Sequence, residues 1–280
     1  MSTATVTELW RYPVKSMRGE RVDALDVTEA GAAGDRRYAV VDVETEKVGS
    51  AKHPRLWGAL LQCAARTEGD DIVITLPDGG ECAASDDRAS DALSTLLGRP
   101  VRLTSAAPER PRYLAVWPEG TLPDEDVARY GIGEQDGGTL TDLGLAFAAP
   151  AGTFFDVCAL HVITRATLDR LGYPVERWRP NVVVDGPAEP YTENAWMGST
   201  LALGTVQAPA LIPTMRCIMT TLAQGSLPRD NEVLRRVKDE NRIEIPGMGT
   251  WSCVGAYATV SGGGRIAVGD VATLPGAAGG

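Results

Sequence analysis

The sequence predicts a mainly β protein with a few peripheral helices, an α+β chain in which strands dominate. Three observations indicate this fold class. Short β-branched or alternating segments, bounded by glycine, proline or acidic residues, recur along most of the chain. Helical periodicity is confined to a few short stretches. The length of 280 residues allows one large or two modest domains, long enough to bury a core.

The first hundred residues are expected to form an all-β unit with one helix. The helix is predicted at 86–97, where apolar residues share a face and Gly98 followed by Pro100 provides a stop signal. Residues 105–138 are rich in proline, glycine and acids, which indicates a long connection between two lobes or a lid over a pocket. The strands of this half are expected at 5–9, 23–28, 38–42 and 72–76.

The second half is expected to combine helices and strands. Thr164 is predicted to cap a helix that ends at Gly172, and another helix is predicted at 228–238, beginning after a proline. The tail, 275–280, is expected to fray. Strands are expected at 180–185, 201–208, 254–260 and 265–271.

Charge and composition disfavour several classes of protein. A net charge of −10 argues against a nucleic-acid partner, because such binding depends on a basic surface. The apolar runs fall short of the ~20 residues that a spanning helix needs, and no secretory signal is visible, so we expect a cytoplasmic protein without membrane association. Five cysteines without CxxC spacing argue against a disulfide framework or structural zinc, and two histidines give a zinc enzyme or a Ser-His-Asp hydrolase few residues.

Cys217 is the most informative single residue. It follows Arg216 directly, and a neighbouring guanidinium lowers the cost of forming a thiolate. The thiolate is the form that binds a soft metal or attacks an electrophile. The local sequence alone favours the alternative of a buried, inert cysteine.

Three basic clusters elsewhere in the chain could meet around an anion. They contain Lys15 with Ser16, Arg36, and Arg179 with Asn181, each in a turn beside a predicted strand. Lysine and arginine side chains at strand ends can converge on a phosphate and hold it by charge-assisted hydrogen bonds. Taken singly, each cluster is better explained as a solvated surface charge.

Taken in order, these stretches resemble the MOSC family, named for the C-terminal domain of the molybdenum cofactor sulfurase. The resemblance covers nearly the whole chain and is strongest to the branch of amidoxime-reducing components and their bacterial relatives. It implies an N-terminal β-barrel domain over 1–104 and a MOSC β-barrel domain over 139–274, with 105–138 between them. The stretches that carry it are 9–16, 34–42, 51–56, 179–184, Trp196, 216–221 and 265–270.

The resemblance implies a molybdenum cofactor (molybdopterin), a pterin dithiolene with a phosphate, whose metal takes one further sulfur ligand from the protein. By position that ligand is Cys217. Asp156 falls where the family places an acid near the metal, and it could relay protons, although an acid that caps the next turn is an equal alternative. The positions that hold the cofactor correspond to Lys15, Ser16, Arg36, Arg179, Asn181 and Arg216, with Lys52 as a weaker candidate.

The implied activity is reduction of an N-oxygenated small molecule, such as a hydroxylamine, amidoxime or oxime. The electrons would come from a separate ferredoxin or reductase, since the chain carries no four-cysteine cluster motif. Two alternatives remain open. One is a sulfurtransferase or carbon–sulfur bond enzyme with a persulfide or thiolate at Cys217, and the other is a cofactor carrier without catalysis.

The chain departs from the family pattern around the predicted pocket. Thr214 stands where a second cysteine is usual, residues 222–226 replace a Val-Asp-Pro-x-Thr-Gly stretch, and Val157 and Cys158 replace small hydroxyl residues. The substrate is therefore expected to vary more than the scaffold. Three further residues could lie near the site, with core packing as the alternative for each: His161, Trp251 and Cys253.

Overall fold

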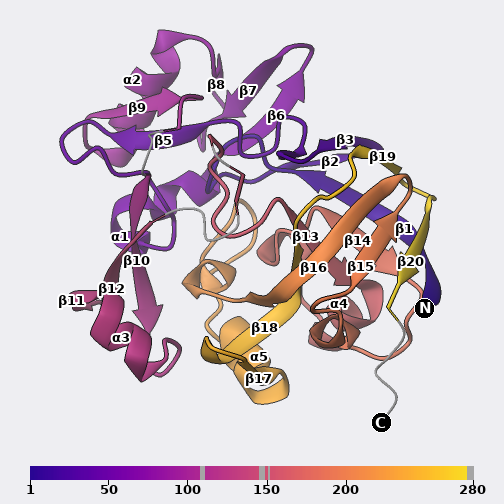
Figure 1. The fold of residues 1–280 in the computed structure, drawn as a ribbon. Coiled ribbons are helices and arrows are strands. Elements are labelled where there is room, and N and C mark those ends of the chain that lie inside the picture. The colour runs from indigo at the N-terminus through magenta and orange to yellow at the C-terminus, as the bar shows by residue number, and fades with distance from the viewer. Residues whose placement is uncertain (108–110, 145–148, 151, 276–280) are drawn as a thin grey trace.

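A closed barrel of seven strands is the largest unit of the fold (Figure 1). The computed structural model describes residues 1–107, 111–144, 149–150 and 152–275. Neighbouring barrel strands are antiparallel except β13 and β14, and β18 pairs back with β13 to close the barrel. In spatial order the strands are β13 (Leu160–Thr164), β14 (Val182–Asp185), β1 (Ser2–Arg11), β20 (Val271–Leu274), β15 (Thr200–Leu203), β16 (Val206–Met215) and β18 (Gly249–Ala258).

The barrel interior is filled by the inward-facing residues of these strands. In β1 the side chains of Ala4, Val6 and Leu9 are buried, with a register shift between Val6 and Glu8. Trp196 belongs to the same core. Two short strands extend the sheet: β2 (Glu20–Val22) pairs with β1, and β17 (Arg242–Ile245) pairs with β18.

The N-terminal region forms smaller sheets around a second core, which includes Val40, Trp57, Leu60 and Leu93. The prediction of a mainly β chain with peripheral helices is confirmed. The elements of this region are β3 (Ala24–Thr28), β4 (Gly31–Ala32), β5 (Ala39–Asp42), α1 (Pro54–Trp57), η1 (Gly58–Gln62), β6 (Ala64–Glu68), β7 (Asp71–Thr75), β8 (Glu81–Ala83), α2 (Asp87–Leu97) and β9 (Val101–Thr104).

The first and the last strand of the described chain are neighbours in the barrel. Ser2 pairs with Leu274 and Thr5 pairs with Val271, so indigo β1 runs beside yellow β20 in Figure 1. A second connection of this kind joins β3 to β19 (Gly264–Ala267). The strands of the two halves are therefore interleaved.

The stretch 105–138, predicted as a connection or a lid, contains regular elements in its described part. They are β10 (Arg112–Pro118), α3 (Asp124–Tyr130) and β11 (Gly131–Gln135), and β12 (Gly138–Gly144) completes a sheet in the order β10-β12-β11. Asp136 and Gly137 both have positive φ, 54° and 75°, between the paired ends of β11 and β12. Asp-Gly is a strong signal for a two-residue hairpin turn, and here it forms one.

Two predicted helices are confirmed with the predicted ends. Gly98 ends α2, whose N-cap is Asp86 rather than a residue before it, and Thr164 and Gly172 bound α4 (Arg165–Leu171). The helix expected at 228–238 is α5 (Glu232–Glu240), and the other helical turns are η2 (Val175–Arg177), η3 (Thr192–Ala195) and η4 (Ile218–Thr221).

Two predicted strands are wrong, because each contains a turn. The stretch 201–208 is the β15–β16 hairpin, in which Gly204 has a φ of 56° and Leu203 pairs with Val206. The stretch 265–271 spans the turn between β19 and β20, where Gly269 has a φ of 92°. Of the tail predicted to fray, 276–280 lies outside the described residues. No helix in the described part of the chain is long and apolar enough to cross a membrane.

Candidate functional site

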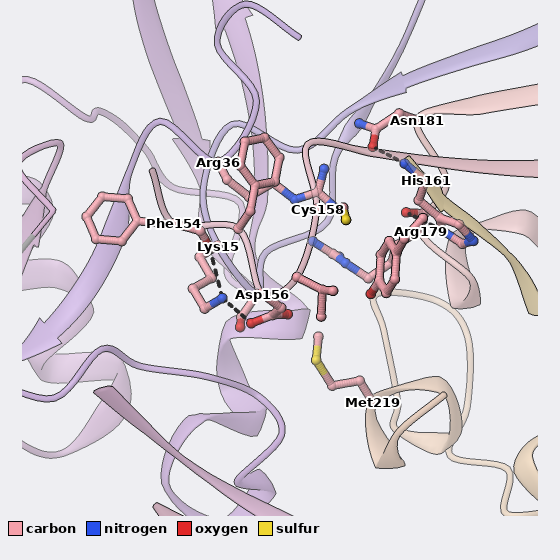
Figure 2. Close-up of a pocket in the computed structure, with 13 residues that line it drawn as sticks. Lys15, Arg36, Phe154, Asp156, Cys158, His161, Arg179, Asn181 and Met219 are labelled. Carbon is pink, nitrogen blue, oxygen red and sulfur yellow. Dashed lines mark hydrogen bonds and ion pairs between the residues drawn. The ribbon is translucent and has the colours of Figure 1, made fainter. Parts of the chain in front are cut away.

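The residues predicted for the site meet around two adjoining cavities. Both cavities are lined by Arg36, Asp156 and Arg179. The smaller, of about 50 Å³, is drawn in Figure 2 and is also lined by Lys15, Ser16 and Asn181. The larger, of about 430 Å³, is also lined by Lys52, Arg216 and Cys217.

The barrel topology explains why residues distant in sequence meet here. Leu9 near the end of β1 pairs with Val182 at the start of β14, which is level with Val162 of β13. The turns after β1, before β13 and before β14 therefore emerge at the same end of the barrel. These turns supply Lys15 with Ser16, Asp156, and Arg179 with Asn181.

Asp156 forms ion pairs with two lysines. Lys15 Nζ pairs with Asp156 Oδ1 and donates to the Phe154 carbonyl oxygen at 3.0 Å (Figure 2). Lys52 Nζ lies 3.4 Å from Asp156 Oδ2 and 3.2 Å from the Tyr113 hydroxyl. Burial opposes the charge of Asp156, but the two lysines outweigh it and hold the pKa of this carboxyl well below its usual range. Burial, opposed by Asp156, lowers the pKa of Lys15 to about 8.

Two guanidinium groups stack on the ring of Tyr12. Arg36 lies 4.5 Å from the ring centroid and Arg179 lies 4.3 Å from it. Their φ angles, 46° and 55°, and that of Ser16, 66°, fall in the left-handed region, which for such residues requires support from the surrounding structure. Burial and the nearby Arg36 charge lower the pKa of Arg179 to about 10. An anion bound between these arginines would relieve their repulsion.

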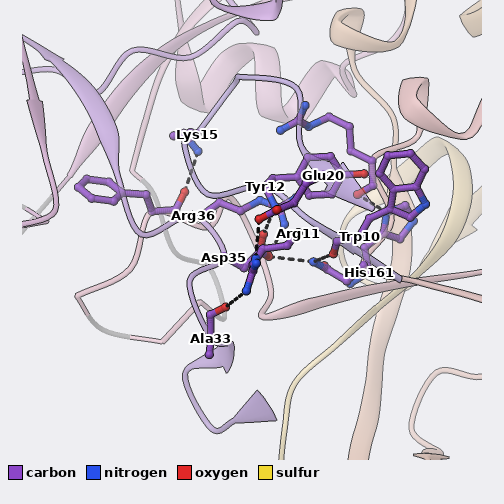
Figure 3. Close-up of polar contacts among 12 residues, drawn as sticks. Trp10, Arg11, Tyr12, Lys15, Glu20, Ala33, Asp35, Arg36 and His161 are labelled. Atoms are coloured by element: carbon purple, nitrogen blue, oxygen red, sulfur yellow. Dashed lines mark hydrogen bonds and ion pairs between the residues drawn. The ribbon is translucent and has the colours of Figure 1, made fainter. Parts of the chain in front are cut away.

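Asp35 and Asn181 connect the stacked arginines to the barrel. Figure 3 shows Asp35 close to Tyr12 and Arg36. Asp35 pairs with Arg36 and accepts from Tyr12 N at 2.6 Å and from Asn181 Nδ2 at 2.8 Å. Asn181 Nδ2 also donates to the Trp10 carbonyl oxygen at 3.3 Å, and its Oδ1 accepts from His161 N at 3.1 Å. Both amide hydrogens of Asn181 are thus already donated within the protein, and its predicted contact with a cofactor stays a prediction.

The Cys217 loop is held from both sides. The Cys217 carbonyl oxygen accepts from Thr220 N at 3.2 Å and from Thr220 Oγ1 at 3.0 Å, at the start of η4. Arg216 Nη2 donates to the Trp178 carbonyl oxygen at 2.9 Å. Arg177, which precedes Trp178, donates back to the Cys217 loop: its Nη1 lies 3.0 Å from the Thr220 carbonyl oxygen and 3.2 Å from that of Leu222.

Cys217 differs from the other cysteines in its surroundings. It is half-buried and lines the larger cavity. Burial raises the pKa of Cys63, Cys158 and Cys253 to about 12 each, which makes their thiolates unfavourable. Cys82 is also half-buried, but it lies in β8 and lines neither cavity. Cys217 is therefore the thiol best placed to meet a soft metal.

Several lining residues were missed or left open by the sequence analysis. His161 lines both cavities, and Trp251 lies in β18 and lines the larger one, whereas Cys253 is fully buried. Tyr12 and Asp35 were missed as partners of the arginines. The sequence could have identified them, because Asp35 directly precedes Arg36 and Tyr12 lies in the same short stretch as Lys15.

These features define a β-barrel protein with a cationic cavity beside a thiol. Residues 3–100 match the MOSC N-terminal beta barrel domain, and residues 154–273 match the MOSC domain. The chain therefore belongs to the MOSC family, as the sequence motifs predicted.

Individual relatives are similar over most of their length. Mitochondrial amidoxime-reducing component 1 of Homo sapiens is 25% identical over 97% of this chain and 83% of that protein. Human mitochondrial amidoxime reducing component 2 is 25% identical over 95% of this chain and 82% of that protein. A crystal structure of the YUAD protein from Bacillus subtilis aligns over 96% of this chain and 94% of that one, at 11% identity and a TM-score of 0.39.

Proposed function

We propose that this protein is a molybdenum-cofactor-dependent oxidoreductase that reduces an N-oxygenated small molecule. The observation that carries the proposal is the convergence of Cys217, Asp156 and five cationic side chains on two adjoining cavities of an acidic chain. The similarity to proteins named as amidoxime-reducing components supports the reaction class.

The residues around the cavities fit an anionic cofactor with a soft metal. Arg36 and Arg179 repel each other across Tyr12, and among the described atoms Arg216 Nε is buried without a hydrogen-bond partner. Cys217 offers the soft sulfur ligand. The anionic end would be held by Lys15, Ser16, Arg36, Arg179 and Arg216, with Lys52 beside them and Asn181 fixing the arginines through Asp35.

The reaction breaks an N–O bond and consumes two electrons and two protons. For a hydroxylamine the nitrogen is reduced to an amine, and the oxygen leaves as water. When bound, the cofactor would supply the two-electron redox chemistry, with electrons from a separate ferredoxin or reductase. Asp156 is ionised and paired with Lys15, so Lys15 Nζ would hold the proton near neutral pH and donate it, and Asp156 would orient this ammonium group.

Metal analysis of Cys217→Ser tests the role of the thiol. We expect the purified wild-type protein to contain about one molybdenum per chain and Cys217→Ser to lose most of it, because a hydroxyl is a poorer soft-metal ligand. The matched control is Cys82→Ser, which changes the other half-buried cysteine and should retain the metal. Equal metal content in all three proteins would contradict the assignment of Cys217 as ligand.

Two further measurements separate the proposal from its alternatives. A metal-free wild-type protein with a cyanide-labile sulfur on Cys217 would instead support sulfur transfer. Molybdenum-containing protein, chemically reduced, should convert N-benzylhydroxylamine to benzylamine. A metal-containing protein that reduces neither a hydroxylamine nor an amidoxime would be a carrier rather than an enzyme.

A further inference from the structure

The larger cavity is lined by two chemically different groups of residues. One group is polar and consists of Cys217, Asp156 and the cationic side chains of Arg36, Lys52, Arg179 and Arg216. Part of the remaining lining is aromatic, aliphatic or thioether and comes from two places in the fold, the β10–β12 sheet with α3 and the strands β16 and β18 with the turn before β18. The residues of this part are Trp117, Tyr130, Leu143, Met215, Met248 and Trp251, here called the apolar wall.

The two tryptophans of the apolar wall have no indole N–H left for a ligand. Trp117 Nε1 donates to Thr141 Oγ1 at 3.0 Å, and Trp251 Nε1 donates to the Met248 carbonyl oxygen at 2.6 Å. Their ring centroids are 5.5 Å apart and the rings are inclined by 66°. Both rings are held in fixed orientations, and they offer a ligand carbon edges and faces rather than hydrogen bonds.

Part of the apolar wall lies outside both domain matches. Trp117, Tyr130 and Leu143 fall between residues 100 and 154, where neither the N-terminal nor the MOSC match extends. This stretch forms a sheet and a helix of its own beside the barrel (Figure 1). The wall can therefore set substrate choice without altering the residues that would hold the cofactor.

We infer that the apolar wall binds an uncharged aromatic ring of the substrate and directs its N-oxygenated group toward Cys217 and Asp156. This inference rests on the proposed function. The four cationic side chains of the cavity disfavour a positively charged substrate, and Trp117 and Trp251 of the apolar wall offer a strongly polar ring no hydrogen bond. A flat apolar ring gains from burial against aromatic and thioether side chains, each of which contacts rings favourably.

A binding experiment tests the wall independently of catalysis. The probe is 2-naphthamide, a neutral aromatic amide without an N–O bond, titrated into the protein as purified and followed by tryptophan fluorescence. Met248→Trp adds bulk at a half-buried wall position, so it should fill the cavity without emptying the core. We expect it to weaken binding by about tenfold or more, the loss of one ring contact.

The matched control is Met197→Trp. Met197 is 43% exposed and lines neither cavity, so the same substitution there should change the affinity by less than about twofold. Unchanged binding in Met248→Trp, or an equal loss in both variants, would overturn the inference.

A selectivity measurement distinguishes this inference from the proposed function. Wild-type protein should reduce N-benzylhydroxylamine with a kcat/KM about tenfold or more above that for N-methylhydroxylamine, and Met248→Trp should remove this preference. If both compounds are reduced equally well, the aromatic wall assignment fails and the proposed function stands. If 2-naphthamide binds at the wall but neither hydroxylamine is reduced, the proposed function fails and the aromatic site stands.

Discussion

The buried imidazole of His161 lies between two backbone carbonyl oxygens, and its pKa depends on burial and on the charges of the site. Its Nδ1 lies 3.3 Å from the Arg179 carbonyl oxygen and its Nε2 lies 3.1 Å from the Val254 carbonyl oxygen. A Cβ on Gly255, whose φ is 80°, would lie 2.4 Å from Nε2, so glycine is needed for the imidazole to fit. Burial and the charge of Arg216 lower the pKa of His161 to about 3, so the ring is neutral and can donate to only one of the two carbonyls.

This leads to a prediction about stability and pH. Between pH 6.5 and 3 the unfolded chain binds a proton at His161 that the folded chain does not, so stability is lost as the pH falls. His161→Gln removes this titration, and the loss between pH 6.5 and 5 should shrink by about 2 kcal/mol. Urea unfolding at the two pH values measures it, and equal pH dependence in both proteins would contradict a neutral buried histidine.

At the scale of elements, the Cys217 loop and the segment before β14 hold each other. Arg177 is almost fully buried and donates to three carbonyl oxygens, those of Thr220, Leu222 and Pro228. Arg216 returns a hydrogen bond to Trp178. The position of the Cys217 thiol therefore depends on an arginine that lines neither cavity.

Arg177→Lys should loosen this loop while keeping the charge, since an ammonium cannot reproduce the spread of a guanidinium over separate acceptors. We expect a stability loss of about 2 kcal/mol and faster alkylation of Cys217 by iodoacetamide, measured by mass spectrometry against Cys82 in the same protein. Arg229→Lys, at an exposed position, is the control. An unchanged alkylation rate in Arg177→Lys would show that the loop is fixed by other contacts.

The elements also show what the sequence could and could not predict. Capped helices such as α2 and α4 were predicted because their signals are local. The turns at Gly204 and at Asp136-Gly137 also have local glycine signals in the sequence. The first lies inside a stretch that was predicted as one strand, and the second lies inside the predicted connection. The site residues were predicted through family motifs, whereas the contacts of Asn181 with Asp35 and Trp10 depend on barrel closure, which no local pattern encodes.

At the scale of the whole molecule, β1 makes the two halves of the chain depend on each other. The N-terminal match begins at residue 3, yet β1 pairs with β14 and β20 inside the barrel. Removing β1 would leave each of those strands with a neighbour on one side only and would open the barrel. We therefore expect the two halves to unfold together.

Val6→Ala tests this coupling. Val6 is fully buried in β1, and the substitution should lower the free energy of unfolding by about 2–3 kcal/mol. Far-ultraviolet circular dichroism and tryptophan fluorescence should still follow one shared transition, because Trp57 and Trp196 report on the two cores. Val43→Ala, at a position 48% exposed, should change stability by less than about 0.5 kcal/mol. Two separated transitions would refute the coupling.

The pairing of β1 with β20 also constrains how the protein can be made. A ribosome releases Ser2 long before Leu274, its partner in the barrel. Until β20 has been translated, β1 has exposed hydrogen-bonding groups on the edge that β20 will later cover, and such edges invite pairing with other chains. The barrel therefore stays open until β20 is made, and slower translation between β1 and β20 would prolong the period in which the nascent chain is prone to aggregate.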